Sequence, residues 1–188
     1  MKKVLLCTPR SGSTFAIKWL LNQNKLLKTC RSDEPFWEGN PIQFLESERK
    51  LGKEYCYKVH VHHIEEYLDW FQSFYKPEEI YILRRRNLWN QYLSHLYQHE
   101  NNWYLTYTLN AAGLKTEPKL AKNYKNTLDL FMQWQDRLNK FNYDTIYYED
   151  IEYKINHIIF SKYINYEKYF TNIGEIKSYY EVLYNRHT

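Results

Sequence analysis

The chain has 188 residues, of which 44% are hydrophobic and 26% are charged, close to the values of an average globular domain. This length fits one domain with a buried core, and the composition excludes a disordered or fibrous chain. The formal net charge of +4 is too small for a protein that coats DNA, and it favours a local site for a small anionic ligand.

The three cysteines, Cys7, Cys30 and Cys56, are too few and too widely spaced for a disulfide framework or a CxxC metal site. An odd number of cysteines is typical of a reducing compartment. No run approaches the roughly 18 apolar residues that a membrane span needs, and the apolar run at 4–7 is too short for the core of a signal peptide. We therefore expect a soluble, cytoplasmic protein with no membrane partner.

Apolar runs and helical periodicity alternate along the chain. Strands are predicted at 3–8, 26–30, 54–61, 79–83 and 143–148. Helices are predicted at 12–23, 41–50, 63–75, 88–99, 119–141, 153–163 and 174–184. Because the chain has no repeats or linkers, this alternation predicts a single α/β domain over residues 1–188. Its three layers, α/β/α, would surround a central, mostly parallel sheet of about five strands.

A tight turn, Pro9-Arg10-Ser11-Gly12-Ser13-Thr14, follows the first predicted strand. In a parallel sheet, such a turn and the helix after it begin at the edge where ligands bind, and free amides and the helix dipole face one point. Gly12 permits close approach to the backbone. Hydroxyl and guanidinium donors add to the turn: Arg10, Ser11, Ser13 and Thr14. This turn predicts a P-loop-like phosphate site, although it is not a Walker A loop, because Ser13 stands where the lysine would follow the glycine. An ordinary helix cap is the alternative.

A second cationic group follows the strand predicted at 79–83. Arg84, Arg85 and Arg86 are consecutive, Asn87 is typical of a helix N-cap, and Ser94 lies eight residues after Arg86. Three adjacent arginines repel one another unless an anion or acidic side chains balance them. Arg86 and Ser94 would then hold a second anionic group, and the alternative is a basic surface corner with a solvated serine.

These segments resemble those of sulfotransferases that use 3′-phosphoadenosine 5′-phosphosulfate (PAPS). Residues 9–15 resemble the 5′-phosphosulfate loop of that family, and residues 86–94 resemble its 3′-phosphate motif, with the same Arg-to-Ser spacing. Residues 148–151, Tyr-Glu-Asp-Ile, resemble a Tyr-Glu-Asp-Leu segment that follows a strand in the family, and Trp134 lies on the preceding helix. The resemblance covers about residues 4–151, in the order of the family. The family's Gly-rich C-terminal loop is not visible.

The resemblance implies an enzyme with a P-loop-like sulfotransferase fold that moves a sulfuryl group from PAPS to a hydroxyl acceptor and needs no metal. It implies that Arg10 and the turn hold the 5′-phosphosulfate and that Arg86 and Ser94 hold the 3′-phosphate. The turn residues concerned are Ser11, Gly12, Ser13 and Thr14. Phe15 would lie near the adenine or belong to the core. We expect a small-molecule or carbohydrate acceptor, a sugar rather than a phenol or a peptide tyrosine, and no nucleic acid partner.

Two residues compete for the role of the base in this in-line displacement. Glu34 precedes Pro35-Phe36-Trp37, and the segment resembles the one that carries the base in carbohydrate sulfotransferases. The flanking aromatic rings would partly desolvate its carboxylate. His60, in Lys58-Val59-His60, resembles the Lys-x-His of phenol and steroid sulfotransferases, and a neutral imidazole suits this role at pH 7. We expect Glu34 to be the base, with Lys58 and His60 contacting the donor or the acceptor.

His60 and His62 alternate along one predicted strand, with His63 adjacent, so a metal pair has to be considered. The spacing places no third ligand, and we therefore expect hydrogen-bonded histidines and no metal site.

Other functions fit parts of the sequence. A P-loop kinase of a small metabolite would need Glu149 or Asp150 to hold Mg²⁺, and it lacks the lysine after Gly12. A non-catalytic domain that binds adenosine bisphosphate would use the same two anion sites. An RNA-binding surface would stack bases on aromatic side chains beside the arginines, although the helical spacing of these side chains is typical of a core: Trp89, Tyr92 and Tyr97. The irregular stretch 101–118 fits either a lid over a ligand or a packed surface loop.

Overall fold

The computed structural model describes residues 2–23, 28–29, 40–50, 55–64, 67–74, 79–101, 117–151 and 165–187. The chain forms two compact units, one of residues 1–86 and 137–151 and the other of residues 87–136 and 152–188. Glu34, the helix predicted at 153–163 and nearly all of the stretch 101–118 lie outside the described residues. The single-domain interpretation stays a prediction.

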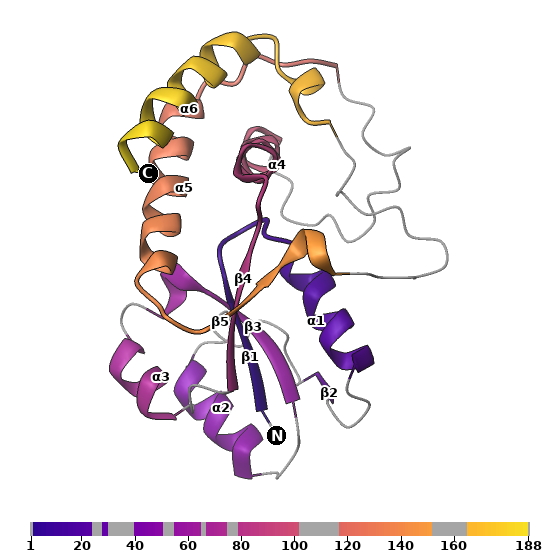
Figure 1. The fold of residues 1–188 in the computed structure, drawn as a ribbon, viewed down its shortest axis with the longest axis vertical. Helices are drawn as coiled ribbons and strands as arrows, with labels where there is room; N and C mark the ends of the chain where they lie inside the picture. The colour runs from indigo at the N-terminus through magenta and orange to yellow at the C-terminus, as the bar shows by residue number, and fades with distance from the viewer. Residues whose placement is uncertain are drawn as a thin grey trace. The chain divides into compact units, whose positions relative to one another are not determined.

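The first unit is built on an all-parallel sheet (Figure 1). Four strands lie in the order β3 (Tyr55–His60), β1 (Lys2–Cys7), β4 (Ile80–Arg84) and β5 (Asp144–Tyr147). The two-residue strand β2 (Lys28–Thr29) pairs with the free side of β3. Every pairing between these strands is parallel, which confirms the predicted α/β class.

Helices flank this sheet. Figure 1 shows α1 (Ser13–Gln23) on one face and α2 (Pro41–Lys50) and α3 (Leu68–Phe74) on the other. Right-handed connections explain the arrangement. The connection through α1 leads from β1 towards the β2 side of the sheet, whereas the connections through α2 and α3 each lead back in the opposite direction.

The centre of the sheet forms the core of the first unit. Residues 4–7 of β1 are completely buried, as expected for a central strand covered on both faces. β1 and β4 are neighbours, but the chain leaves β1 towards β3 and leaves β4 towards β5. At such a switch point, parallel α/β sheets bind ligands beyond the carboxyl ends of the strands. The turn after β1 and the arginines after β4 both lie at this position.

The second unit consists of helices packed around aromatic side chains. Its main helices are α4 (Leu88–Glu100), α5 (Tyr124–Asn139, of which 137–139 belong to the first unit) and α6 (Ile173–His187). Asn87 is the N-cap of α4, as predicted, since its side chain accepts a hydrogen bond from the Asn90 amide at 2.9 Å. The largest core side chains are aromatic: Tyr92, Tyr97, Phe131, Tyr166, Tyr169 and Phe170.

Two predicted helices begin later than expected. Residues Val61–His63, at the start of the helix predicted for 63–75, form a 3₁₀ turn, η2, and α3 begins at Leu68. The helix predicted at 119–141 begins at Tyr124, because Lys119 forms a β-bridge with Phe170. The Lys119 carbonyl, which a helix starting here would use, accepts from the Thr171 amide at 3.0 Å instead. Within the described ranges, no helix is both long enough and apolar enough to cross a membrane.

Candidate anion-binding site

The functional residues predicted from the sequence gather at the carboxyl edge of the parallel sheet. Cys7, the last residue of β1, pairs with His60 of β3 on one side and with Leu83 of β4 on the other. Leu83 in turn pairs with Ile146 of β5. The segments that follow these strands therefore begin at one edge of the first unit: η2 after β3, the turn 8–12 after β1, the arginines after β4, and the 3₁₀ turn η6 (Tyr148–Asp150) after β5.

The turn after β1 has an unusual backbone. Gly12 has a φ of 90° and Arg10 has a φ of 60°, and both values lie in the left-handed region. For arginine this conformation is strained, and such strain is found most often at ligand sites. The first hydrogen bonds of α1 end on the carbonyl of Gly12, so the amides of Ser13 and Thr14 take no part in the helix ladder. The turn therefore offers amide donors at a helix N-terminus.

Two buried polar side chains lie in and beside this turn. Ser11 is completely buried, and its hydroxyl has no hydrogen-bond partner among the described residues. An unsatisfied buried hydroxyl costs about 1–3 kcal/mol, so it marks a place where a bound acceptor would stabilise the protein. Lys58 is only 4% exposed, and its ammonium donates to the hydroxyl of Thr14 at 2.7 Å. The ammonium therefore brings a positive charge into the interior next to the turn.

Tyr148 connects the turn with the arginines. A Cβ atom added to Gly12 would overlap the ring of Tyr148, so the glycine is required by a side chain as well as by its φ. Phe15 meets the same ring edge to face, with centroids 5.6 Å apart, and the Arg85 guanidinium lies 4.5 Å from the ring centroid. Phe15 is 8% exposed, which favours the core interpretation of this residue over contact with an adenine. Nothing in the sequence pairs Gly12 with Tyr148.

The three arginines at the end of β4, of which Arg84 is the last residue of the strand, have partners within the protein. Arg84 donates to Asn139 Oδ1 at 2.6 Å and to a backbone carbonyl at the end of α5. Arg85 is buried, and its Nε lies 3.8 Å from Glu149 Oε1. The expectation that acidic groups or an anion must balance these charges is met, at least in part, by the acidic residues of η6.

Arg86 is the most exposed of the three, and it forms a two-pronged ion pair with Asp150. Both guanidinium Nη atoms donate to the carboxylate, with Nη2 and Oδ2 2.6 Å apart. The hydrogen bond raises the pKa of Arg86 and lowers the pKa of Asp150. The Arg86 amide also donates to Glu149 Oε2 at 3.1 Å. A phosphate bound to Arg86 would therefore have to compete with a carboxylate already in place.

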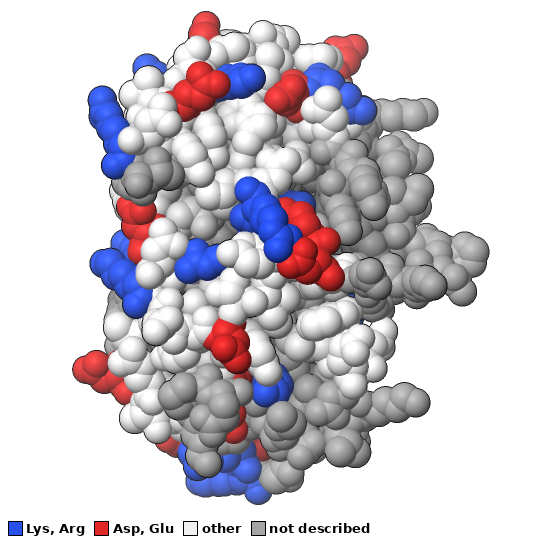
Figure 2. Space-filling view, viewed as in Figure 1, with Lys and Arg blue, Asp and Glu red and all other residues white. Residues whose placement is uncertain are grey.

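Ser94, the other residue predicted to hold the 3′-phosphate, is buried in α4. It belongs to the second unit and Arg86 to the first, so their joint contact with one phosphate stays a prediction. Tyr92 and Tyr97 lie in the core of the second unit and Trp89 packs against it, which argues against a stacking platform for RNA. On the face shown in Figure 2, described basic and acidic side chains are interspersed.

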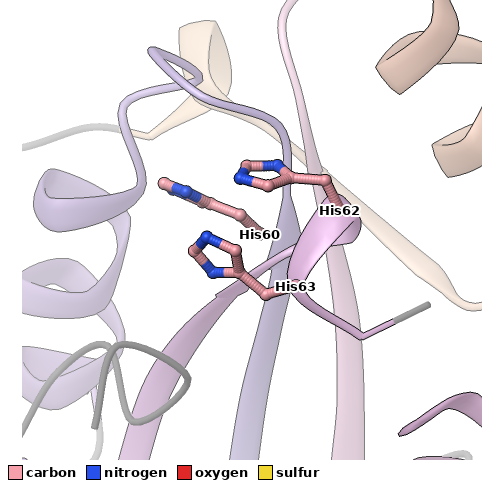
Figure 3. A group of neighbouring side chains, drawn as sticks. All are labelled: His60, His62 and His63. Carbon is pink, nitrogen blue, oxygen red and sulfur yellow. The ribbon is translucent and has the colours of Figure 1, made fainter. Parts of the chain in front are cut away.

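His60, at the end of β3, lies on the same strand face as Lys58, since side chains two residues apart share a face. Its ring is close to those of His62 and His63 in η2, so the structure supplies the third histidine that the spacing alone did not place (Figure 3). The predicted base Glu34 lies outside the described residues.

Comparison with known proteins finds no matching family model, no similar curated protein and no similar solved structure. Any functional conclusion therefore depends on the motifs themselves and on their common position at the sheet edge.

Proposed function

We propose that this protein is a sulfotransferase that moves a sulfuryl group from PAPS to a hydroxyl acceptor. The observation that carries the proposal is the turn after β1 beside the N-terminus of α1. There the buried hydroxyl of Ser11 has no hydrogen-bond partner in the described part of the chain, and the buried ammonium of Lys58 lies next to it at Thr14. Backbone amides, a hydroxyl donor and a buried positive charge together suit an anion of the phosphosulfate type. In this proposal the chain is a three-layer α/β/α sulfotransferase domain whose P-loop-like turn binds the donor.

The donor has charged groups at two ends, and the proposal assigns one site to each. The 5′-phosphosulfate binds at the turn, with Arg10, Lys58 and the amides of Ser13 and Thr14 as donors. The 3′-phosphate binds Arg86, which exchanges its Asp150 partner for the ligand; the role of Ser94 at this phosphate comes from the resemblance alone. Arg86 is more than half exposed, so this exchange needs no rearrangement of the core.

The reaction is an in-line displacement at sulfur. The acceptor oxygen attacks the sulfur atom, the bond from sulfur to the bridging oxygen breaks, and 3′-phosphoadenosine 5′-phosphate (PAP) leaves. Arg10 and Lys58 stabilise the negative charge that develops on the bridging oxygen. The proton of the acceptor passes to a base, for which Glu34 and His60 are the two candidates. His60 follows Lys58 on the same face of β3, which supports a position beside the donor.

The acceptor is proposed from the resemblance alone. The segment around Glu34 resembles that of carbohydrate sulfotransferases, so sugar hydroxyls are the first acceptors to test. The kinase alternative has less support, because Glu149 and Asp150, which would have to hold Mg²⁺, are both engaged with arginines.

The test combines PAP binding with transfer of radiolabelled sulfate. The full chain is titrated with PAP by calorimetry, and it is incubated with ³⁵S-labelled PAPS and separate pools of oligosaccharides, phenols and tyrosine peptides. We expect PAP binding and a labelled oligosaccharide. Failure to bind PAP would overturn the proposal, and binding without transfer to any pool would favour the non-catalytic domain. Glu34→Gln and His60→Gln then separate the two bases, because only loss of the true base should slow transfer while PAP binding persists.

A further inference from the structure

Three histidine side chains converge at the end of β3. His60 is the last residue of the strand, and His62 and His63 belong to the 3₁₀ turn η2 that follows it. One nitrogen from each ring can be chosen so that all three lie within 4.8 Å of one another. Figure 3 shows the rings gathered on one side of the strand end, with His62 and His63 each turning a nitrogen towards the space between the rings. The centroids of His62 and His63 are 4.1 Å apart, and each lies less than 6 Å from that of His60.

The arrangement is close to what a divalent transition metal needs. Zinc binds imidazole nitrogens at about 2.0–2.1 Å in tetrahedral geometry, which places the nitrogens of two ligands roughly 3.4 Å apart. Nitrogens within 4.8 Å of one another reach that separation by rotation of the side chains, without movement of the strand. Three imidazoles leave a fourth position for water or another ligand, as in zinc sites with three histidines.

The backbone supports convergence of these rings. His60 is fixed by parallel pairing of β3 with the buried strand β1, where its partner is Cys7. Val61, between His60 and His62, is 1% exposed, which anchors η2 to the core. The three rings are half-buried, so an ion from solution can reach them while part of its surroundings stays dry. Such anchoring lowers the entropy that is lost when the ligands are ordered around an ion.

Positive charges lie near this site. Arg137 is close enough to His62 to act on it electrostatically, and a metal ion binds only the neutral form of an imidazole. Arg137 and the nearby strand residue Lys58 are themselves cationic and weaken the attraction for a cation. The imidazole nitrogens must therefore supply the affinity, which favours zinc, copper, nickel or cobalt over magnesium or calcium.

We infer that His60, His62 and His63 form a binding site for one divalent transition-metal ion of the zinc class. The site shares His60 with the candidate bases of the proposed sulfuryl transfer, but its three ligands are present whether or not the protein binds PAPS. It differs from the expectation of no metal site, which was based on spacing alone, because the 3₁₀ turn brings the ring of His63 close to that of His60.

Metal binding by the full chain tests this inference. The protein is stripped with a chelator and titrated with Zn²⁺ against a chromogenic indicator, and separately with Co²⁺, whose visible absorption reports tetrahedral coordination. We expect one equivalent of Zn²⁺, a tetrahedral Co²⁺ spectrum and an increase in melting temperature with Zn²⁺. His62→Ala with His63→Ala should weaken Zn²⁺ binding more than about tenfold, since even the loss of an outer partner of a metal ligand costs 10–100-fold.

The control is His99→Ala, which removes an exposed histidine at the end of α4. This variant should bind one equivalent of Zn²⁺ with the affinity of the wild type. If the double variant does not fold, His63→Gln alone provides the same comparison, with melting curves showing that it is folded. Failure of the wild type to bind one equivalent, or equal binding by wild type and the ligand variants, would overturn the inference. PAP binding is measured on the same samples without metal, so failure of the metal site is distinguishable from failure of the proposed function.

Discussion

Two cationic regions lie at the same edge of the sheet, and they differ in how their charges are satisfied. In the first region, the turn after β1 with its neighbour Lys58, the buried hydroxyl of Ser11 has no partner among the described residues, and the Lys58 ammonium donates to the hydroxyl of Thr14. After β4, Arg85 and Arg86 face the carboxylates of η6. The first region contains a buried donor, the Ser11 hydroxyl, that no described residue satisfies, whereas the second already contains acidic partners.

The sequence predicts both anion sites without indicating which binds a ligand more strongly. The difference in their partners indicates which one does. A ligand at the turn would gain from a buried, low-dielectric environment in which charge-assisted hydrogen bonds are strong. A ligand at Arg86 would replace the Asp150 carboxylate, so its net gain is only the difference between two anions bound to the same guanidinium, on a surface where solvent screens ion pairs. We therefore expect the turn to dominate both donor affinity and the rate of transfer.

The largest expected effect comes from Arg10→Ala. The loss of one preorganised donor to a developing charge typically lowers the rate by about 10²–10³, and we expect a decrease of this size in kcat. The rate of transfer from ³⁵S-labelled PAPS at saturating donor measures it. Arg186→Ala, which removes an exposed arginine from α6, is the control and should keep the wild-type rate. An unchanged rate in Arg10→Ala would exclude the turn as the site of chemistry.

Lys58→Met tests the buried charge of the turn with a side chain of similar length. Hydrogen bonds to charged groups contribute about 1.5–3 kcal/mol, so PAP affinity should decrease roughly 10–150-fold. The stability of the free protein should change little or increase, because the desolvation cost of the ammonium disappears. Lys3→Met is the matched control, since Lys3 is also buried but lies at the opposite end of β1, with Tyr81 as its partner. Equal PAP affinity in the two variants would remove Lys58 from the donor site.

Much of the first unit is predictable from local pattern. The central strands are short apolar runs, and α2 has the predicted bounds, 41–50, because it begins at a proline suited to the first turn and ends in basic residues. The start of α3 was predicted wrongly, because the segment with three histidines has no periodicity that distinguishes a 3₁₀ turn from a longer helix. The bridge that delays α5 joins residues 119 and 170, and no local pattern reports such a contact.

The site is predictable only in its parts. The turn after β1 and the arginine segment are visible because chemistry and spacing lie within one short stretch. The partners that decide their behaviour come from distant residues: Tyr148 packs on Gly12, and Asp150 pairs with Arg86. These contacts depend on the order of strands in the sheet, which brings β5 next to β4. The sequence indicates that acidic groups or an anion must balance the arginines, but not which acidic residues do so.

The Gly12→Ala variant tests the packing of the turn against Tyr148, the residue that connects the turn with the arginines. The added methyl group would overlap the ring of Tyr148, and overpacking of this kind costs about 1–3 kcal/mol in the free energy of unfolding. Urea denaturation measures the loss. The control is Gly174→Ala in α6, where a Cβ meets nothing within 4 Å, so this variant should be neutral or slightly stabilising. The cost of Gly12→Ala should decrease in a Tyr148→Leu background, and an undiminished cost would show that the ring is not its cause.

The smallest effect is expected from Asp150→Asn, which acts on the region that is already paired. Without the carboxylate, Arg86 is released for a phosphate, so PAP affinity should increase a few-fold, whereas Glu181→Gln, an exposed substitution on α6, should leave it unchanged. Lower pH should act in the same direction as Asp150→Asn, because protonation of Asp150 also releases Arg86. Since Arg86 lowers the pKa of Asp150, the stabilisation from the pair is complete above the usual carboxyl pKa and is lost as the pH falls through the lowered value. At neutral pH the carboxylate therefore competes fully with a ligand. If Asp150→Asn weakens PAP binding instead, Asp150 positions Arg86 for the phosphate rather than competing with it, and the contrast between the two regions would not hold.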